Sequence, residues 1–283
     1  MTTEPDWRVL ALLAATPVSR TWQVEEGGSL AVLRKDEPGA RRLGLNRAAE
    51  PDVLRAAAAA GLGPACRLAD PAAGLLLTDW LPGRAWTASD LQEPDNLRRA
   101  ASLLRRVHAT PLAGPVVDLG AAIDRYAAAA GAGSAALAAT ARQQLAQALA
   151  VGAPSGATPL PRESSPRVSS GRGVASEGAP ARGGLCFCHN DPTPGNFIAG
   201  PAGGLHLIDW EYAGLCHPGF DLAGLAVGAA LTEERVNLLL QTYRGRPPTG
   251  AETDRHRDWS ALCASLGELW ARAVAAGGVK AGV

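Results

Sequence analysis

The sequence predicts an α+β fold in which a small unit of strands precedes a larger, mainly helical part. An alternating apolar pattern around a glycine turn occupies residues 21–35, which is typical of a β-hairpin. From residue 97 onward, helical patterns dominate. The 283 residues, of which 47% are apolar and 19% charged, can bury a sizeable core in one large domain or two modest ones.

The beginning of the chain shows a helical pattern. Trp7, Leu10, Leu13 and Ala14 stand at helical spacing, and Pro17 ends this stretch. We therefore expect a short helix over the first fifteen or so residues.

The next elements are a hairpin and a helix. Residues 21–24 and 30–35 alternate on either side of a turn at 25–29. Residues 42–60 are rich in Ala and Leu and predict a helix, interrupted only at Pro51. A second pair of strands, over 66–68 and 75–78, is expected to complete an N-terminal lobe ending at residue 82.

The second part, residues 83–283, is expected to be mainly helical. Residues 97–109 place Leu97, Leu103 and Leu104 on one face of an amphipathic helix. Residues 152–184 contain few large apolar side chains and predict a disordered loop. The other expected elements are one or two helices over 121–150, strands at 185–188 and 205–208, and helices over 222–243 and 259–275.

Charge and cysteine content restrict the class of protein. Lys and Arg number 27, as do Asp and Glu, so the net charge is zero, which argues against a nucleic-acid or membrane-surface binder. No apolar run is long enough to span a membrane, and the first residues do not resemble a signal peptide. Five cysteines do not suggest a disulfide framework. We expect a cytoplasmic protein, monomeric or weakly dimeric.

The most informative stretch lies between residues 185 and 223. A strand leads into Asp191, Asn196 follows five residues later, and Asp209 stands at the end of a strand after a hairpin. Phosphoryl transfer needs a carboxylate at the attacking hydroxyl, together with an amide and a second carboxylate that hold Mg²⁺. Turn formation alone would explain each of these residues, but their order and spacing favour a kinase.

This two-part motif, His-x-Asp-x4-Asn followed by Ile-Asp-Trp-Glu, resembles the aminoglycoside phosphotransferase and choline kinase superfamily. Within it, CHNDPTPGNF and LIDWEYAG most resemble the bacterial choline kinase and thiamine kinase branch. The resemblance implies a bilobal protein-kinase-like fold with an antiparallel-sheet N-lobe and a helical C-lobe. It also implies the use of ATP and Mg²⁺.

The resemblance assigns roles to the residues of this stretch. Asp191 would be the catalytic base, and Asn196 and Asp209 the metal ligands. Glu211 would be a further carboxylate for metal or substrate. His189 would brace the catalytic loop, and Asp221 matches an acid that supports it.

Other matches lie in the N-terminal lobe. Arg34 matches a basic residue that contacts phosphate, and Glu50 matches the helix residue that pairs with it. Residues 78–83, including Asp79 and Leu81, match the hinge whose backbone would bind adenine. The segment 16–21 departs from the family because it lacks the glycines that commonly cover the phosphates.

Two further patterns have simpler interpretations. Alternation places the thiols of Cys186 and Cys188 on one face of a strand, next to His189, but no second Cys/His pair stands at zinc spacing. We therefore expect ordinary buried cysteines. His108, near the end of the helix 97–109, is expected to be a packing residue rather than a catalyst.

Aromatic residues suggest an acceptor. In relatives with quaternary-amine substrates, aromatic side chains form the pocket, and aromatic faces attract such cations. The corresponding candidates here are Tyr212, Tyr243, Trp259 and Trp270, although for each residue alone an ordinary core position is the better explanation.

The expected activity is therefore transfer of the ATP γ-phosphate to a hydroxyl of a small molecule, with choline first and thiamine second. Two alternatives stay open. One is an amino-sugar or aminoglycoside kinase, which the balanced charge mildly disfavours. The other is a non-catalytic kinase-like binding protein, which the glycine-poor segment 16–21 favours.

Overall fold

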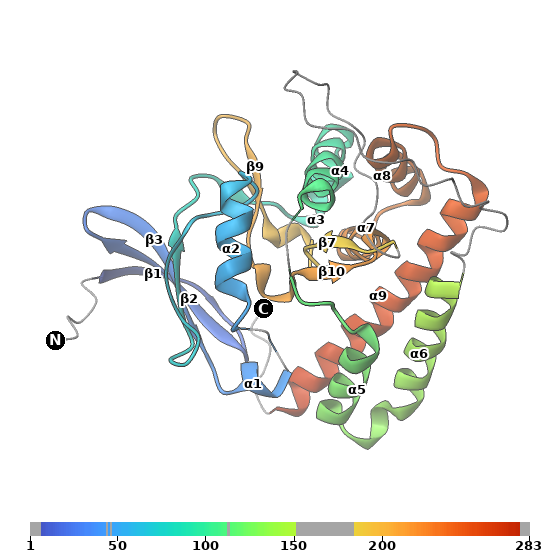
Figure 1. Ribbon diagram of the computed structural model, residues 1–283, viewed down its shortest axis with the longest axis horizontal. Helices are drawn as coiled ribbons and strands as arrows, with labels where there is room; N and C mark the ends of the chain where they lie inside the picture. Colours follow the sequence, from blue (N-terminus) through green and yellow to red (C-terminus); the bar gives the residue numbers. More distant parts are fainter. Residues whose placement is uncertain (1–6, 44, 46, 112–113, 151–183, 278–283) are drawn as a thin grey trace, which may run out of the picture.

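The computed structural model contains an antiparallel sheet with a helix against it, followed by a larger region of helices (Figure 1). This arrangement confirms the predicted fold class. The structure describes residues 7–43, 45, 47–111, 114–150 and 184–277. The loop predicted over 152–184 lies outside the described residues, apart from Gly184.

The predicted hairpin is present as β2 (Ser19–Glu26) and β3 (Ser29–Asp36). Its two turn residues, Gly27 and Gly28, have φ of 56° and 78°. A two-residue turn with positive φ at both positions matches the twist of the paired strands, and glycine adopts it without steric cost.

The prediction of a helix at the start of the chain is wrong. Residues Trp7–Ala15 form strand β1, which pairs antiparallel with β2 from Trp7 opposite Glu26 to Ala15 opposite Arg20. The segment WRVLALLAA is apolar at nearly every position, so periodicity cannot distinguish a helix from a strand here. Pairing with the hairpin edge, which satisfies the backbone, decides the outcome.

Two more strands complete the sheet. β4 (Cys66–Asp70) and β5 (Leu75–Asp79) confirm the predicted pair, and the sheet order is β1-β2-β3-β5-β4. β5 pairs with β3, placing Leu76 opposite Arg34. Arg34 is thus held on a central strand, with limited freedom to move.

The single helix expected over 42–60 is divided. A short α1 (Gly39–Leu43) is followed by α2 (Glu50–Ala59), in which Pro51 occupies the first turn. Proline suits this position because the first helical N–H groups have no intrahelical acceptor. The break places Glu50 at the beginning of α2, facing the sheet.

The helical region follows the predicted order. α4 buries Leu97, Leu103 and Leu104, the face expected from its pattern, against α8 and the short strands, in a core that residues of α2 also join. α5 and α6 pack on the long α9, which crosses the region diagonally in Figure 1. The helices are α3 (Ala88–Gln92), α4 (Pro94–Ala109), α5 (Leu119–Ala130), α6 (Ala135–Ala150), α7 (Pro218–Gly228), α8 (Glu233–Arg244) and α9 (Gly250–Ala276).

Short strands between the two regions carry the loops of the motif. β7 pairs with β10, and β8 pairs with β6 and β9. Their bounds are β6 (Arg84–Ala85), β7 (Cys186–Cys188), β8 (Phe197–Ala199), β9 (Leu205–Leu207) and β10 (Gly214–Cys216). Among the helices that the structure describes, none is both long and apolar enough to cross a membrane.

Two histidines, His256, which is buried, and His217, which is half-buried, predict how stability depends on pH. Burial lowers the pKa of His217 and of His256 from 6.5 to about 4 in each case, and for His217 nearby cations add to this effect. The Nδ1 atom of His217 also accepts the Gly219 N–H at the start of α7, and it can do so only while Nδ1 is unprotonated.

We therefore expect the free energy of unfolding to be highest above pH 6.5 and to fall by about 2 kcal/mol or more as the pH falls from 6.5 to 4. In this window the unfolded chain binds protons that the folded histidines exclude. Urea unfolding at successive pH values measures the effect, and His256→Gln should make the dependence shallower. An unchanged slope in that variant would contradict the assignment to His256.

Candidate active site

The loop after β7 presents Asp191 in a fixed orientation. Asn190 adopts a left-handed conformation, with φ of 64°, which asparagine tolerates better than most residues. The side-chain amide of Asn196 donates to the Asp191 backbone oxygen at 2.8 Å and to its carboxylate Oδ2 at 2.9 Å. Asn196 therefore orients the carboxylate and turns its own amide oxygen away from it.

Asp221 anchors this loop through its backbone. It is fully buried at the start of α7 and accepts the backbone N–H groups of His189 at 2.9 Å and Asn190 at 2.7 Å. His108 Nε2 lies 2.8 Å from the same carboxylate. Burial acts to raise the pKa of Asp221, but these hydrogen bonds outweigh it and hold that pKa below its usual value.

His189 links the two parts of the motif. Its Nε2 lies 2.9 Å from the carbonyl oxygen of Ile208, and its Nδ1 accepts the Asp191 N–H at 3.3 Å. Burial lowers the pKa of His189, so the ring is neutral with its proton on Nε2. These bonds fix the spacing between the Asp191 loop and the strand end before Asp209.

Asp209 lies in a cluster of acids. Its carboxylate and those of Glu50 and Glu211 have oxygen atoms within 4.8 Å of one another. Asp209 also has a left-handed backbone, with φ of 65°. Its side chain is 41% exposed, whereas those of Glu50 and Glu211 are 3% and 7% exposed. Asp209 is therefore the member of the cluster that solvent and ligands can reach.

Arg34 is held within this cluster. It makes a two-pronged contact with Glu50, at 2.7 and 2.5 Å, so the predicted pairing is present. It also lies 3.6 Å from Asp209 and 3.4 Å from Glu211. A bidentate guanidinium–carboxylate pair fixes orientation as well as charge.

Arg47 is a site residue that sequence reasoning did not identify. Its guanidinium contacts Glu211 and Asp36 and lies 3.3 Å from Glu50, and its side chain is 11% exposed. It lies in the segment between α1 and α2, which no local pattern links to Glu211. Its proximity to Glu50, three residues later, was the only available signal.

The acids influence one another. Burial raises the pKa of Asp191 well above its usual value, and Asp209 and Glu211 add to this, while Asn196 opposes it. Burial and Asp209 also raise the pKa of Glu211 to about 7, although Arg47 and Arg34 oppose the rise. A carboxylate with a raised pKa is a stronger proton acceptor near neutral pH.

A cavity of about 560 Å³ opens beside these acids. It extends from the turn between β1 and β2 to α5, α7 and α9. The turn contributes Thr16, whose hydroxyl accepts the N–H groups of Val18 and Ser19 and thereby braces a segment that lacks glycine. The polar lining of the cavity includes Asp191, Asp209 and Glu211. The aromatic lining of the cavity is Tyr126, Tyr212, Phe220 and Trp270.

The structure divides the aromatic candidates. Tyr212 and Trp270 line the cavity. Tyr243 and Trp259 do not, which corrects their proposed place in the pocket. Tyr243 faces His108 between α8 and α4, with its hydroxyl 2.7 Å from Nδ1, and Trp259 is 1% exposed and stacks on His217. Trp259 is a core residue and Tyr243 is partly buried against the core, because their helices turn these faces inward.

The expected hinge follows β5. The side chain of Asp79 is engaged by Arg67, at 2.6 Å, and Leu81 is partly buried. Neither residue lines the cavity beside Asp191. Their predicted role, through the backbone, stays a prediction.

The donor set suits a hard divalent cation. Asn196 offers an amide oxygen, and Asp209 offers an exposed carboxylate. A carboxylate oxygen of Glu211 lies within 4.8 Å of one of Asp209. Mg²⁺ prefers a few such oxygen ligands and retains water for the others. The residues predicted from the sequence thus have the chemistry that the ion needs.

Comparison with known proteins identifies similar sequences and folds. The profile of a family described as "Phosphotransferase enzyme family" matches residues 15–259. A segment of 56 residues is 45% identical to protein LicA of Haemophilus influenzae, covering 20% of this chain and 21% of that protein.

Solved structures share the fold over nearly the whole chain. A choline/ethanolamine kinase family protein from Mesorhizobium loti is 25% identical, with a TM-score of 0.67, over 93% of this chain and 78% of the other. The choline kinase LicA of Streptococcus pneumoniae is 18% identical, with a TM-score of 0.71, over 96% and 89%. An aminoglycoside-3'-phosphotransferase of type VIII has a TM-score of 0.53 at 20% identity, over 91% and 93%.

Proposed function

Because the chain belongs to the phosphotransferase enzyme family, as a small-molecule kinase, we propose that it transfers the γ-phosphate of ATP to the hydroxyl group of choline. The observation that carries the proposal is the aromatic cavity beside Asp191. The faces of Tyr212 and Trp270 attract a quaternary ammonium, and the carboxylates of Asp209 and Glu211 add negative charge. Such a pocket suits a small cation with a hydroxyl at one end.

Asp191 accepts the proton of the choline hydroxyl as the oxygen of that hydroxyl attacks the γ-phosphorus of ATP. The bond from that phosphorus to the bridging oxygen of ADP breaks, and phosphocholine and ADP form. Asn196 keeps Oδ2 of Asp191 oriented for this transfer. Arg34, fixed by Glu50, positions the phosphates. Asn196 and Asp209 would hold Mg²⁺, which would supply charge neutralisation at the phosphate oxygens.

A panel of acceptors tests the proposal. ADP formation is measured with ATP, Mg²⁺ and, in turn, choline, ethanolamine, thiamine and amino sugars, and the phosphorylated product is identified by mass spectrometry. We expect choline to give the highest kcat/KM. A higher value for thiamine or an amino sugar would replace choline as acceptor. ATP binding without phosphorylation of any acceptor would indicate a non-catalytic binding protein.

Trp270 is expected to recognise the cationic end of choline. Trp270→Leu should raise the KM for choline about 10-fold and leave the KM for ATP unchanged, because a cation–aromatic contact contributes about 1–2 kcal/mol. For a neutral choline analogue, in which carbon replaces nitrogen, the KM should rise less. Trp22→Leu, on β2 and outside the cavity lining, is the control. An equal rise in KM for choline and for its neutral analogue in Trp270→Leu would contradict a cation-specific contact.

Arg34 is expected to act on ATP. Arg34→Gln should raise the KM for ATP by about 10-fold or more, because it removes a largely buried, preoriented cation. The adjacent Lys35 is exposed and points to the other side of β3, so Lys35→Gln is a matched control that should leave this KM unchanged. Similar effects of the two substitutions would contradict the role of Arg34.

A further inference from the structure

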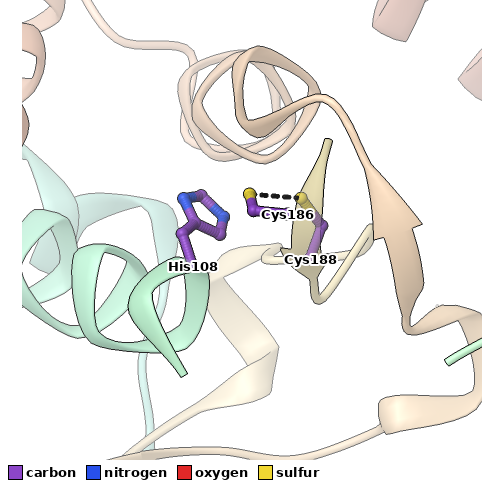
Figure 2. Close-up of side chains that lie close together, drawn as sticks. All are labelled: His108, Cys186 and Cys188. Carbon is purple, nitrogen blue, oxygen red and sulfur yellow. Dashed lines mark hydrogen bonds between the residues drawn. The ribbon is translucent and has the colours of Figure 1, made fainter. Parts of the chain in front are cut away.

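Three potential metal ligands meet behind the catalytic loop. His108 of α4 and the thiols of Cys186 and Cys188 of β7 have ligand atoms within 4.8 Å of one another. Figure 2 shows the imidazole facing the two thiols, which lie on the same side of the strand. The sequence suggested His189 as the neighbour of these cysteines, but His189 points to Ile208 instead. The third ligand thus comes from a helix about eighty residues away.

The spacing of the thiols is suited to chelation. The two Sγ atoms are 3.6 Å apart. Two sulfur atoms that share a tetrahedral zinc ion at about 2.3 Å each lie about 3.8 Å from one another. A disulfide would require about 2.05 Å, and hence a much larger movement of two residues on one extended strand. The observed separation is therefore close to that of a shared metal ligand pair.

His108 is oriented as metal-binding histidines are. One nitrogen, Nε2, lies 2.8 Å from the buried carboxylate of Asp221, and the other, Nδ1, lies 2.7 Å from the Tyr243 hydroxyl. In Figure 2 the nitrogen on the side of the thiols is Nε2, the one that also contacts Asp221. A metal bound there would replace that contact, while Nδ1 keeps its hydrogen bond to the Tyr243 hydroxyl, which fixes the ring orientation and tautomer. Asp221 keeps the backbone N–H groups of His189 and Asn190.

We propose that His108, Cys186 and Cys188 form a binding site for a thiophilic d¹⁰ cation of the Zn²⁺ or Cd²⁺ type. Two thiolates and a neutral imidazole give a site of zero net charge with such an ion, which suits its burial. Cys188 is fully buried, while Cys186 is partly exposed and provides the side of entry. The site differs from the oxygen-rich one at Asp209, which selects a hard cation.

Cadmium titration of the reduced, full-length protein tests this proposal. The solution contains excess Mg²⁺, so that oxygen sites are occupied by a hard ion. We expect one equivalent of Cd²⁺ to produce thiolate-to-cadmium charge-transfer absorption. Cys186→Ser and Cys188→Ser should each weaken binding by at least about 100-fold. Cys66→Ser and Cys263→Ser, at cysteines outside the cluster, are matched controls that should leave it unchanged.

A second measurement uses the wild-type protein and is therefore independent of how the variants fold. X-ray absorption of the wild-type protein with one equivalent of Zn²⁺ should show two sulfur ligands and an imidazole. Oxygen-only coordination, or unchanged Cd²⁺ absorption in both cysteine variants of the cluster, would overturn the proposal. So would a reduced protein that fails to bind Cd²⁺.

Discussion

Asp191→Asn is expected to lower kcat by at least about 100-fold while leaving the KM for ATP within about two-fold of its wild-type value. The substitution is nearly isosteric, so the loop can keep its hydrogen bonds to Asp221 and its contact with Asn196. It removes the group that accepts the hydroxyl proton, and general-base catalysis contributes about 10²–10⁴-fold. Steady-state kinetics with the best acceptor gives both constants.

The pH dependence of kcat provides a second test of Asp191. A base must be ionised to accept a proton, so wild-type kcat should fall as the pH falls through the pKa of Asp191. Burial and the neighbouring acids place that pKa above its usual value of 3.8. The dependence should disappear in Asp191→Asn. The exposed Asp95, changed to Asn, serves as control, and a kcat within about three-fold of wild type in Asp191→Asn would exclude Asp191 as the base.

Asp209→Asn is expected to reduce kcat/KM for ATP by at least about 100-fold at fixed Mg²⁺, equivalent to about 2.7 kcal/mol. Asparagine tolerates the left-handed backbone of this position, at φ of 65°, so the local fold should persist. The change removes an anionic oxygen from a site with few ligands. Because the lost affinity is for the ion, a higher Mg²⁺ concentration should restore part of the activity.

The control for Asp209 is Asp209→Ala, which forces an alanine into the same left-handed backbone. Circular dichroism and urea unfolding separate a folding defect in that variant from a loss of metal binding. Nucleotide titration with and without Mg²⁺ then measures the metal-dependent part directly. A wild-type Mg²⁺ dependence in Asp209→Asn would contradict the assignment of Asp209 as a metal ligand.

The sequence by itself determined the parts that depend on local spacing. The glycine turn predicted the β2–β3 hairpin, and the helical pattern predicted the buried face of α4. The motif around Asp191, Asn196 and Asp209 predicted a functional site, because a tight loop and a hairpin strand bring residues at such short separations together. Their catalytic and metal-binding roles stay predictions until the variants are measured.

The tertiary structure decided what depends on contacts between distant segments. Pairing with β2, not local propensity, makes residues 7–15 a strand, because an apolar segment fits either period. The direction in which packed helices face excludes Tyr243 and Trp259 from the cavity. Helix packing also brings His108 to the two cysteines of β7.

Arg47 shows the same limit within the site. Its contact with Glu211 joins positions 164 residues apart, and that contact exists only because α2 packs against the segment 210–212. Local spacing fixes which residues share a strand, a turn or a helix face. Burial and charge pairing in the folded chain determine which of those faces meet, and these depend on the whole core rather than on any single segment.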